Sequence, residues 1–274
     1  MARRAAPNMA APSAASAPVR AVAAGVADSH RTLVYGLHAI QGVLKSSPER
    51  VLEVWVAQAR DDARSRELTR GAAAAGVHVH AATTAALDKM VGEVVHQGAV
   101  AAIRPLKPWD ENDLLEWLDG FGAAPLLLVL DGITDPHNLG ACLRCADAAG
   151  VQAVIAPKDR VAGVDAVARK VAAGAAEFVP VASVTNLART LEALKERRVW
   201  VAGLAGEAPQ SLYGADLNRA LALVMGAEGA GMRRLTREKC DFLVHIPMMG
   251  RVESLNVSVA AGIALFEARR QRMG

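Results

Sequence analysis

The stretch Ile246-Pro-Met-Met-Gly-Arg-Val-Glu-Ser-Leu-Asn-Val-Ser-Val-Ala260 joins a short apolar run to the last helical segment of the chain. The apolar run, Phe242 to Ile246, is stopped by Pro247, and a polar loop follows. Ser254 and Asn256 are residue types that cap helix N-termini, so a helix is predicted to begin there. Its first turn leaves backbone N–H groups free. The stretch therefore predicts a polar site directly in front of the terminal helix.

The predicted terminal helix has two apolar faces. Val257, Ala260, Ala261, Ala264 and Leu265 form one face, and Val259, Ile263 and Phe266 form the other. A surface helix of a globular protein usually has one apolar stripe. We therefore expect this helix to be covered on both sides, by its own sheet and by another subunit.

Upstream of this helix, short apolar runs alternate with helical segments from residue 125 to residue 272. The expected strands are 126–130, 153–156, 178–181, 199–204, 221–225 and 242–246, and the expected helices between them are 139–149, 164–173 and 186–197. Continuous apolar strands are typical of a buried parallel sheet. The alternation predicts an α/β fold with helices on both faces of that sheet.

The first part of the chain predicts a smaller α/β unit at residues 31–105. Its expected helices are 35–44, 63–75 and 84–90, and its expected strands are 51–57, 77–80 and 99–103. Residues 106–124 predict a linker with one short helix starting at Asn112. Residues 1–30 are rich in Ala, Pro and Ser with almost no acidic residue, which predicts a disordered tail.

Composition limits the class of protein. The formal net charge of +3 permits a polyanionic partner without requiring one. No apolar run reaches the roughly 18–20 residues of a membrane span, so no membrane partner is expected. Cys142 and Cys145 form a C-x-x-C pair, which is either a redox pair or, as we favour, buried packing. Three thiols without a zinc-ligand spacing predict no metal and a reducing, cytoplasmic setting.

Three loops begin where an apolar strand ends: 131–144, 226–231 and 246–260. Ligands of parallel sheets lie beyond the carboxyl ends of the strands, so the polar residues of these loops are expected to meet at one rim. The loop Gly226-Ala-Glu-Gly-Ala-Gly231 matches neither the dinucleotide fingerprint nor a phosphate-binding loop. Ser254 has no neighbouring His and no nucleophile elbow. His137 and His245 lack the spacing of a metal pair.

These loops contain three motifs of a known family. They are Asp131-x-x-x-Asp-Pro-x-Asn138-x-Gly140-x-x-x-Arg144, Val224-Met-Gly-Ala-Glu-Gly229 and Ile246-Pro-Met-x-Gly250-x-x-x-Ser254-Leu-Asn-Val-Ser258. Together they resemble the signatures of SpoU/TrmH (SPOUT) RNA 2′-O-methyltransferases. Tyr35-Gly-Leu-His-Ala39 and His96-Gln-Gly98 resemble the substrate-binding domain of the same family. The chain is most similar to the branch that methylates a guanosine of 23S ribosomal RNA.

The resemblance implies several further properties. The C-terminal parallel sheet would contain a deep trefoil knot. S-adenosylmethionine would be held mainly by backbone groups around Gly226, Ile246 and Leu255. The enzyme would be a homodimer, and its N-terminal domain would bind 23S ribosomal RNA or its precursor, with phosphates bound by Lys and Arg.

In the reaction that this resemblance implies, the ribose 2′-OH attacks the sulfonium methyl group in line, without a metal or a covalent nucleophile. Arg144 would accept the proton, with Asn138, Glu228, Ser254 and Asn256 orienting it and the ribose. Because arginine has a pKa above about 12, a cation that stabilises the alkoxide or binds the adjacent phosphate is the better interpretation. Two alternatives stay open: a transfer RNA 2′-O-methyltransferase and a non-catalytic RNA-binding relative.

Overall fold

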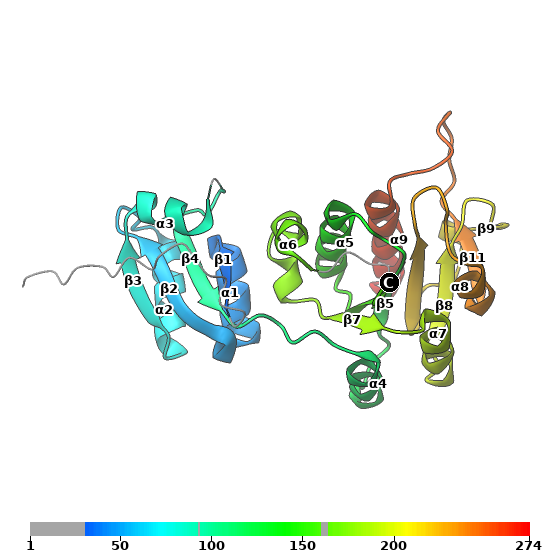
Figure 1. The fold of residues 1–274 in the computed structure, drawn as a ribbon, viewed down its shortest axis with the longest axis horizontal. Coiled ribbons are helices and arrows are strands. Elements are labelled where there is room, and N and C mark those ends of the chain that lie inside the picture. Colours follow the sequence, from blue (N-terminus) through cyan, green and yellow to red (C-terminus); the bar gives the residue numbers. More distant parts are fainter. Residues whose placement is uncertain (1–30, 93, 160–163) are drawn as a thin grey trace, which may run out of the picture.

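The computed structural model describes residues 31–92, 94–159 and 164–274 (Figure 1). Residues 1–30, predicted to be a disordered tail, lie outside the described residues. Within the described ranges the chain forms two sheets, one of four strands and one of seven. The first lies within residues 32–103 and the second within residues 126–245.

The first sheet has the strand order β1-β4-β2-β3. Its strands are β1 (Thr32–Tyr35), β2 (Val51–Ala57), β3 (His78–Ala82) and β4 (Ala99–Ile103), with β4 antiparallel to both of its neighbours. Helices α1 (Leu37–Ser46) and α2 (Ala63–Ala74) contribute Ile40 and Leu68 to the core on one face. Helix α3 (Thr84–Val91) contributes Leu87 to the core on the other face. The sequence did not predict β1, a short edge strand that is only partly buried.

The second sheet has the strand order β7-β6-β5-β10-β8-β11-β9, and neighbouring strands in it run parallel. Its strands are β5 (Leu126–Asp131), β6 (Ala153–Pro157), β7 (Val181–Val184), β8 (Trp200–Leu204), β9 (Gln210–Ser211), β10 (Leu221–Gly226) and β11 (Phe242–His245). Along β5, Leu128 packs into the core on one face and Val129 into the core on the other. The sheet is thus buried on both faces, and the predicted α/β fold with a parallel sheet is confirmed.

Helices cover both faces of this sheet, as Figure 1 shows. Helices α5 (Pro136–Ala149), α6 (Ala166–Ala172) and α9 (Val257–Arg272) share one core, to which they contribute Leu139, Ala168 and Leu265. Helices α4 (Glu111–Gly120) and α7 (Leu187–Glu196) share the opposite core, with Leu114 and Leu191. A short helix, α8 (Arg234–Lys239), follows the glycine loop after β10.

Several predicted elements are shifted in the structure; for example, the helix predicted at 35–44 lies at Leu37–Ser46. The strand predicted at 178–181 lies at Val181–Val184 instead, after a 3-10 turn at Ala175–Glu177. The apolar side chain of Phe178, which favoured a strand, packs outside the sheet against α1. The short helix of segment 106–124 begins at Glu111, one residue before the predicted Asn112, because Asp110 caps it.

The two sheets are joined by a contact centred on Glu177, which we call the Glu177 clamp. Arg50, at the end of the 3-10 turn before β2, donates hydrogen bonds to Glu177 Oε2 at 2.9 Å and to the Glu177 carbonyl at 2.7 Å. Arg169 of α6 also pairs with this carboxylate, whose side chain is only 3% exposed. The ring of Phe178 lies so close to Gly42 of α1 that a Cβ there would stand 2.8 Å from it. The contact thus combines a buried ion cluster with close packing.

Candidate active site

The three polar loops meet in one hydrogen-bonded cluster formed by Asn138, Glu228 and Asn256. Asn256 Nδ2 donates to Asn138 Oδ1 and to Glu228 Oε1, both at 2.8 Å. Asn138 Nδ2 donates to the same carboxylate oxygen at 3.3 Å. The three residues come from α5, from the loop after β10 and from the start of α9. We call this set the Asn–Glu–Asn cluster.

Local capping orients two members of this cluster. Asp135 caps α5 by accepting the His137 backbone N–H at 2.9 Å, which sets Asn138 in the first turn. Asn256 caps α9, and its Oδ1 accepts from the backbone N–H of Ser258 at 2.9 Å and from its hydroxyl at 2.6 Å. Because its oxygen accepts twice and its nitrogen donates twice, the Asn256 amide is fixed in one orientation.

Asp131 anchors the loop that follows the glycines. Its buried carboxylate accepts the backbone N–H of Arg233 at 2.8 Å and the Arg233 Nε at 2.6 Å. Asp131 is thus an acceptor for a backbone amide of this loop. Its partner Arg233 was missed, since a separation of 102 residues carries no sequence signal.

The glycine loop is tight. A Cβ at Gly226 would lie 2.2 Å from the Gly231 carbonyl carbon, so no other residue fits there without moving the backbone. Ala227 and Gly231 exchange two backbone hydrogen bonds, at 3.0 and 2.9 Å. Gly229 and Gly231 have φ of +74° and +66°, a conformation that favours glycine. The turn projects Glu228 toward the other two loops.

A cleft of about 950 Å³ opens beside the cluster. It is lined by Gly226, Ile246 and Leu255, the three predicted cofactor contacts, and also by Glu228, Ser254 and Asn256. Its size is at the upper end of the range of about 300–1,000 Å³ that is usual for ligand sites. The end of β8 and the loop after it, residues 204–207, also line the cleft, although no motif in the sequence predicted this. The position of this loop after a predicted strand of the same sheet was the available signal.

Arg144 lies apart from the cluster. It follows Asn138 by six positions on α5, which places it about 9 Å further along the helix axis and on a different side. One turn before it, Gly140 faces α6 so closely that a Cβ would stand 2.5 Å from the Ala168 carbonyl oxygen. The Arg144 side chain is exposed and makes no hydrogen bond within the described part of the chain. A single chain therefore does not bring Arg144 to the other four predicted catalytic residues.

The cysteines of α5 are packing residues. Burial raises the pKa of the Cys142 thiol to about 12, and burial also raises the pKa of Cys145. The Cys145 thiol donates to the Ser258 carbonyl at 3.8 Å, against α9. Because redox chemistry needs a thiolate, this burial supports the packing interpretation.

Other polar groups have structural partners. His245 Nδ1 donates to the Ala208 carbonyl at 2.8 Å. In the ranges that the structure describes, His, Cys, Asp and Glu form no group of three that could hold a metal ion. No helix in those same ranges is long and apolar enough to cross a membrane.

Sequence profiles of known families match both parts of the chain. The profile of the SpoU rRNA methylase family matches residues 125–266, which include the whole Asn–Glu–Asn cluster. The chain belongs to this family. A second profile, described as RNA 2′-O ribose methyltransferase substrate binding, matches residues 33–109, which include the first sheet of this SpoU-family protein.

Curated relatives cover both regions. The 23S rRNA (guanosine-2′-O-)-methyltransferase RlmB of Pseudomonas aeruginosa is 57% identical over 239 residues, covering 87% of this chain and 96% of the relative. The protein of the same description from Escherichia coli K12 is 54% identical, with 88% and 98% covered.

Solved structures agree with the fold. The SpoU methyltransferase AviRb from Streptomyces viridochromogenes, in complex with AdoMet, has a TM-score of 0.68 and 25% identity over 89% of this chain and 92% of that one. A structure described as an RNA 2′-O ribose methyltransferase has a TM-score of 0.66 and 26% identity, with 90% of each chain covered.

Proposed function

We propose that the protein transfers the methyl group of S-adenosylmethionine to the ribose 2′-OH of a guanosine in 23S ribosomal RNA. The observation that carries this proposal is the Asn–Glu–Asn cluster beside a ligand-sized cleft, in a chain 54–57% identical to methyltransferases of that description. Those relatives align over both the catalytic and the substrate-binding regions. This supports an RNA-methylating enzyme over a non-catalytic binding protein.

S-adenosylmethionine fits the chemistry of the cleft. Gly226, Ile246 and Leu255 present backbone groups and apolar side chains, which suit a nucleoside ligand. The cofactor supplies an electrophilic methyl group on a sulfonium. The constraint at Gly226 keeps the glycine loop against the end of β10, so that the backbone remains open to a ligand.

The Asn–Glu–Asn cluster would orient the ribose. In the reaction the 2′ oxygen would form a bond to the methyl carbon while the carbon–sulfur bond breaks, which leaves a neutral thioether, and the hydroxyl proton would pass to solvent water. The Glu228 carboxylate would accept a hydrogen bond from the ribose, while Asn138 and Asn256 hold that carboxylate in place. The exposed hydroxyl of Ser254 lines the cleft and would contact the same substrate. Alignment of this kind lowers the barrier without a covalent intermediate.

Arg144 would act as a fixed cation, which stabilises the developing alkoxide or binds the neighbouring phosphate. Because Arg144 lies outside the cluster, it would reach the reacting ribose only if the bound RNA extends to it or if a second subunit supplies its own Arg144. A homodimer is supported by the second apolar face of α9, where Val259 is 51% and Phe266 is 50% exposed. Light scattering would test it, and a monomeric mass at micromolar concentration would contradict it.

Three further features belong to this proposal. The chain would divide into a substrate-binding domain at 31–105, a linker at 106–124 and a catalytic domain at 125–272. The catalytic domain would contain a trefoil knot, which membership of the SpoU family supports. Arg272 at the end of α9 holds the last helix against the start of this domain, by donating to the carbonyls of Ala124 and Pro125 at 3.0 Å. Action on ribosomal RNA would place the protein in the cytoplasm.

The test is methylation of an unmodified 23S transcript with tritiated S-adenosylmethionine, followed by mapping of the 2′-O-methyl group. We expect one methylated guanosine. Labelling of bulk transfer RNA instead would favour the alternative substrate. That alternative has weaker support, because a solved TrmH/SpoU tRNA modifying enzyme from A. aeolicus matches only 60% of this chain.

A further inference from the structure

The turn His96-Gln97-Gly98, just before β4, holds a glutamine in an unfavourable backbone conformation. Gln97 has φ of +52°, in the left-handed region where a Cβ atom is disfavoured. Strained residues of this kind persist where surrounding contacts hold them, and they gather at functional sites. Two side chains, those of His96 and Arg60, supply such contacts here.

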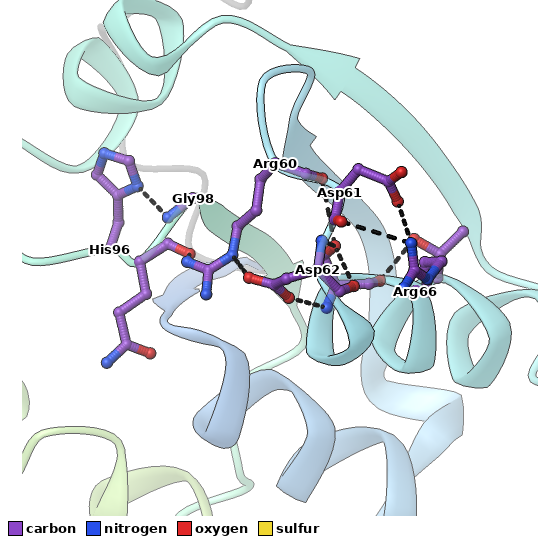
Figure 2. A network of polar contacts seen from close by, with 9 residues as sticks. Arg60, Asp61, Asp62, Arg66, His96 and Gly98 are labelled. Atoms are coloured by element: carbon purple, nitrogen blue, oxygen red, sulfur yellow. Dashed lines mark hydrogen bonds and ion pairs between the residues drawn. The ribbon is translucent and has the colours of Figure 1, made fainter.

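His96 holds the turn through a backbone hydrogen bond. Its side chain is buried, and its Nδ1 accepts the backbone N–H of Gly98 at 3.0 Å (Figure 2). Because Nδ1 accepts, the neutral ring carries its proton on Nε2, which lies 3.0 Å from Asp88 Oδ1. The histidine is thus a bridge between α3 and the turn.

Arg60 holds the turn through the Gln97 carbonyl. Its Nη1 donates to the Gln97 carbonyl. Its Nε donates to Asp62 Oδ2 at 2.6 Å, as Figure 2 shows. A Cβ at Gly98 would lie 3.1 Å from Arg60 Cδ, so the glycine lets the arginine pass closely. His96 and Arg60 both bind backbone atoms of the turn, and neither forms a hydrogen bond with the Gln97 side chain.

The Gln97 side-chain amide does not stabilise the fold through hydrogen bonds in the described part of the chain. The residue is exposed, and its side chain makes no hydrogen bond there. Its Oε1 lies beside Gly36, 3.6 Å from where a Cβ would stand. The motif at Tyr35–Ala39 therefore meets the motif at 96–98 on one surface. A glycine at position 97 would suit the backbone better, and no hydrogen bond of the amide within the described residues offsets that cost.

This surface borders a cleft of about 430 Å³ between the two domains. Tyr35 and Val94 line it on one side, and Lys170 of α6 lines it on the other. Lys170 is exposed and has no ion pair among the described residues. An amide presents a donor and an acceptor side by side, which matches the edge of an unpaired base, while lysine suits a phosphate.

We propose that Gln97 binds the edge of one unpaired base of the RNA substrate at the mouth of this cleft, with Lys170 on a nearby phosphate. This inference rests on the proposed function, because it assumes that the first domain receives RNA. It assigns the turn a task in substrate specificity, separate from the methyl-transfer site.

The decisive variant is Gln97→Gly, which removes the amide and relieves the backbone. We expect it to melt at the wild-type temperature or higher, while KM for the 23S transcript rises about tenfold, equivalent to about 1.4 kcal/mol. The value of kcat at saturating RNA and the affinity for S-adenosylmethionine should not change. Gln97→Asn, which keeps an amide and tolerates the left-handed conformation, should lose less.

Two controls separate base recognition from charge and from general surface effects. Gln58→Ala removes another exposed amide of the same domain and should leave KM unchanged. Lys170→Gln should weaken RNA binding and lower its salt dependence, whereas Gln97→Gly should leave the salt dependence as it is.

A wild-type KM for Gln97→Gly would overturn the inference, as would a lower melting temperature that accounts for the loss. RNA binding is also measured directly by fluorescence anisotropy with a labelled 23S fragment. If the wild-type protein binds this RNA in a Gln97-dependent way but transfers no methyl group, the proposed function fails and this inference survives.

Discussion

Replacement of Glu177 by Gln tests whether the Glu177 clamp sets the position of the proposed substrate-binding domain, which contains the first sheet. The change keeps the shape of the side chain and removes its charge. It places an amide beside two guanidinium groups, those of Arg50 and Arg169. We expect the two domains to separate more often while each stays folded.

The contacts of Glu177 determine how much the replacement weakens the docking of the two domains. Hydrogen bonds to charged groups contribute about 1.5–3 kcal/mol each, and removal of one member of a buried ion pair costs about 3–5 kcal/mol. The Arg50 side chain is 11% exposed and that of Arg169 is 30% exposed, so solvent recovers part of this cost. We expect docking to weaken by about 3 kcal/mol, or about 150-fold. The bond from Arg50 to the Glu177 carbonyl and the contact of Phe178 with Gly42 remain.

Native-state proteolysis of segment 104–108 measures this separation, because cleavage reports the population of the open form. Arg50 Nε also holds the Arg104 carbonyl at 2.9 Å, so Arg50→Met should expose the segment further. KM for RNA should rise while the affinity for S-adenosylmethionine stays constant. Asp119→Asn is the control, since it makes the same charge change in an exposed pair with Arg197. Wild-type cleavage and wild-type KM in Glu177→Gln would refute the reasoning.

Three further predictions follow. Asn256→Asp keeps a capping residue but puts a carboxylate beside Glu228, so we expect kcat to fall at least tenfold with little change in melting temperature; a larger loss of stability than of activity would contradict this. Gly226→Ala places a Cβ 2.2 Å from backbone of its own loop, and calorimetry should find the affinity for S-adenosylmethionine at least tenfold lower, whereas an unchanged affinity would exclude the loop from the cofactor site. The hydrogen bonds that Arg270 donates lower the pKa of Glu267 from 4.5 to about 2, and they stabilise the fold by only about 1–2 kcal/mol because Arg270 is exposed. This stabilisation is complete above pH 4.5 and is lost as the pH falls toward 2. Urea unfolding should therefore show that the stability of the wild-type protein falls over this pH range, and that Glu267→Gln lacks this fall.

Apolar runs and capping residues in the sequence predicted most strands of the second sheet, and they predicted that the three polar loops after these strands lie close together. The apolar run at 126–130 became a strand buried on both faces, and Asn256 caps the last helix as its position indicated. The rule that ligands bind beyond the carboxyl ends of parallel strands correctly predicted that Asn138, Glu228 and Asn256 would converge. These results needed only periodicity, capping and strand order.

The sequence by itself determined the α/β class, the cap of the last helix and the family motifs, because each depends on residues that are close along the chain. Only the tertiary structure decided that Arg144 stands apart from the Asn–Glu–Asn cluster, and that Phe178 packs against α1 instead of forming a strand. It also decided that Glu177 is buried between two arginines, one of them 127 residues away. Contacts at such separations leave no periodic pattern, since they depend on how folded elements pack and not on the propensities of the residues that make them.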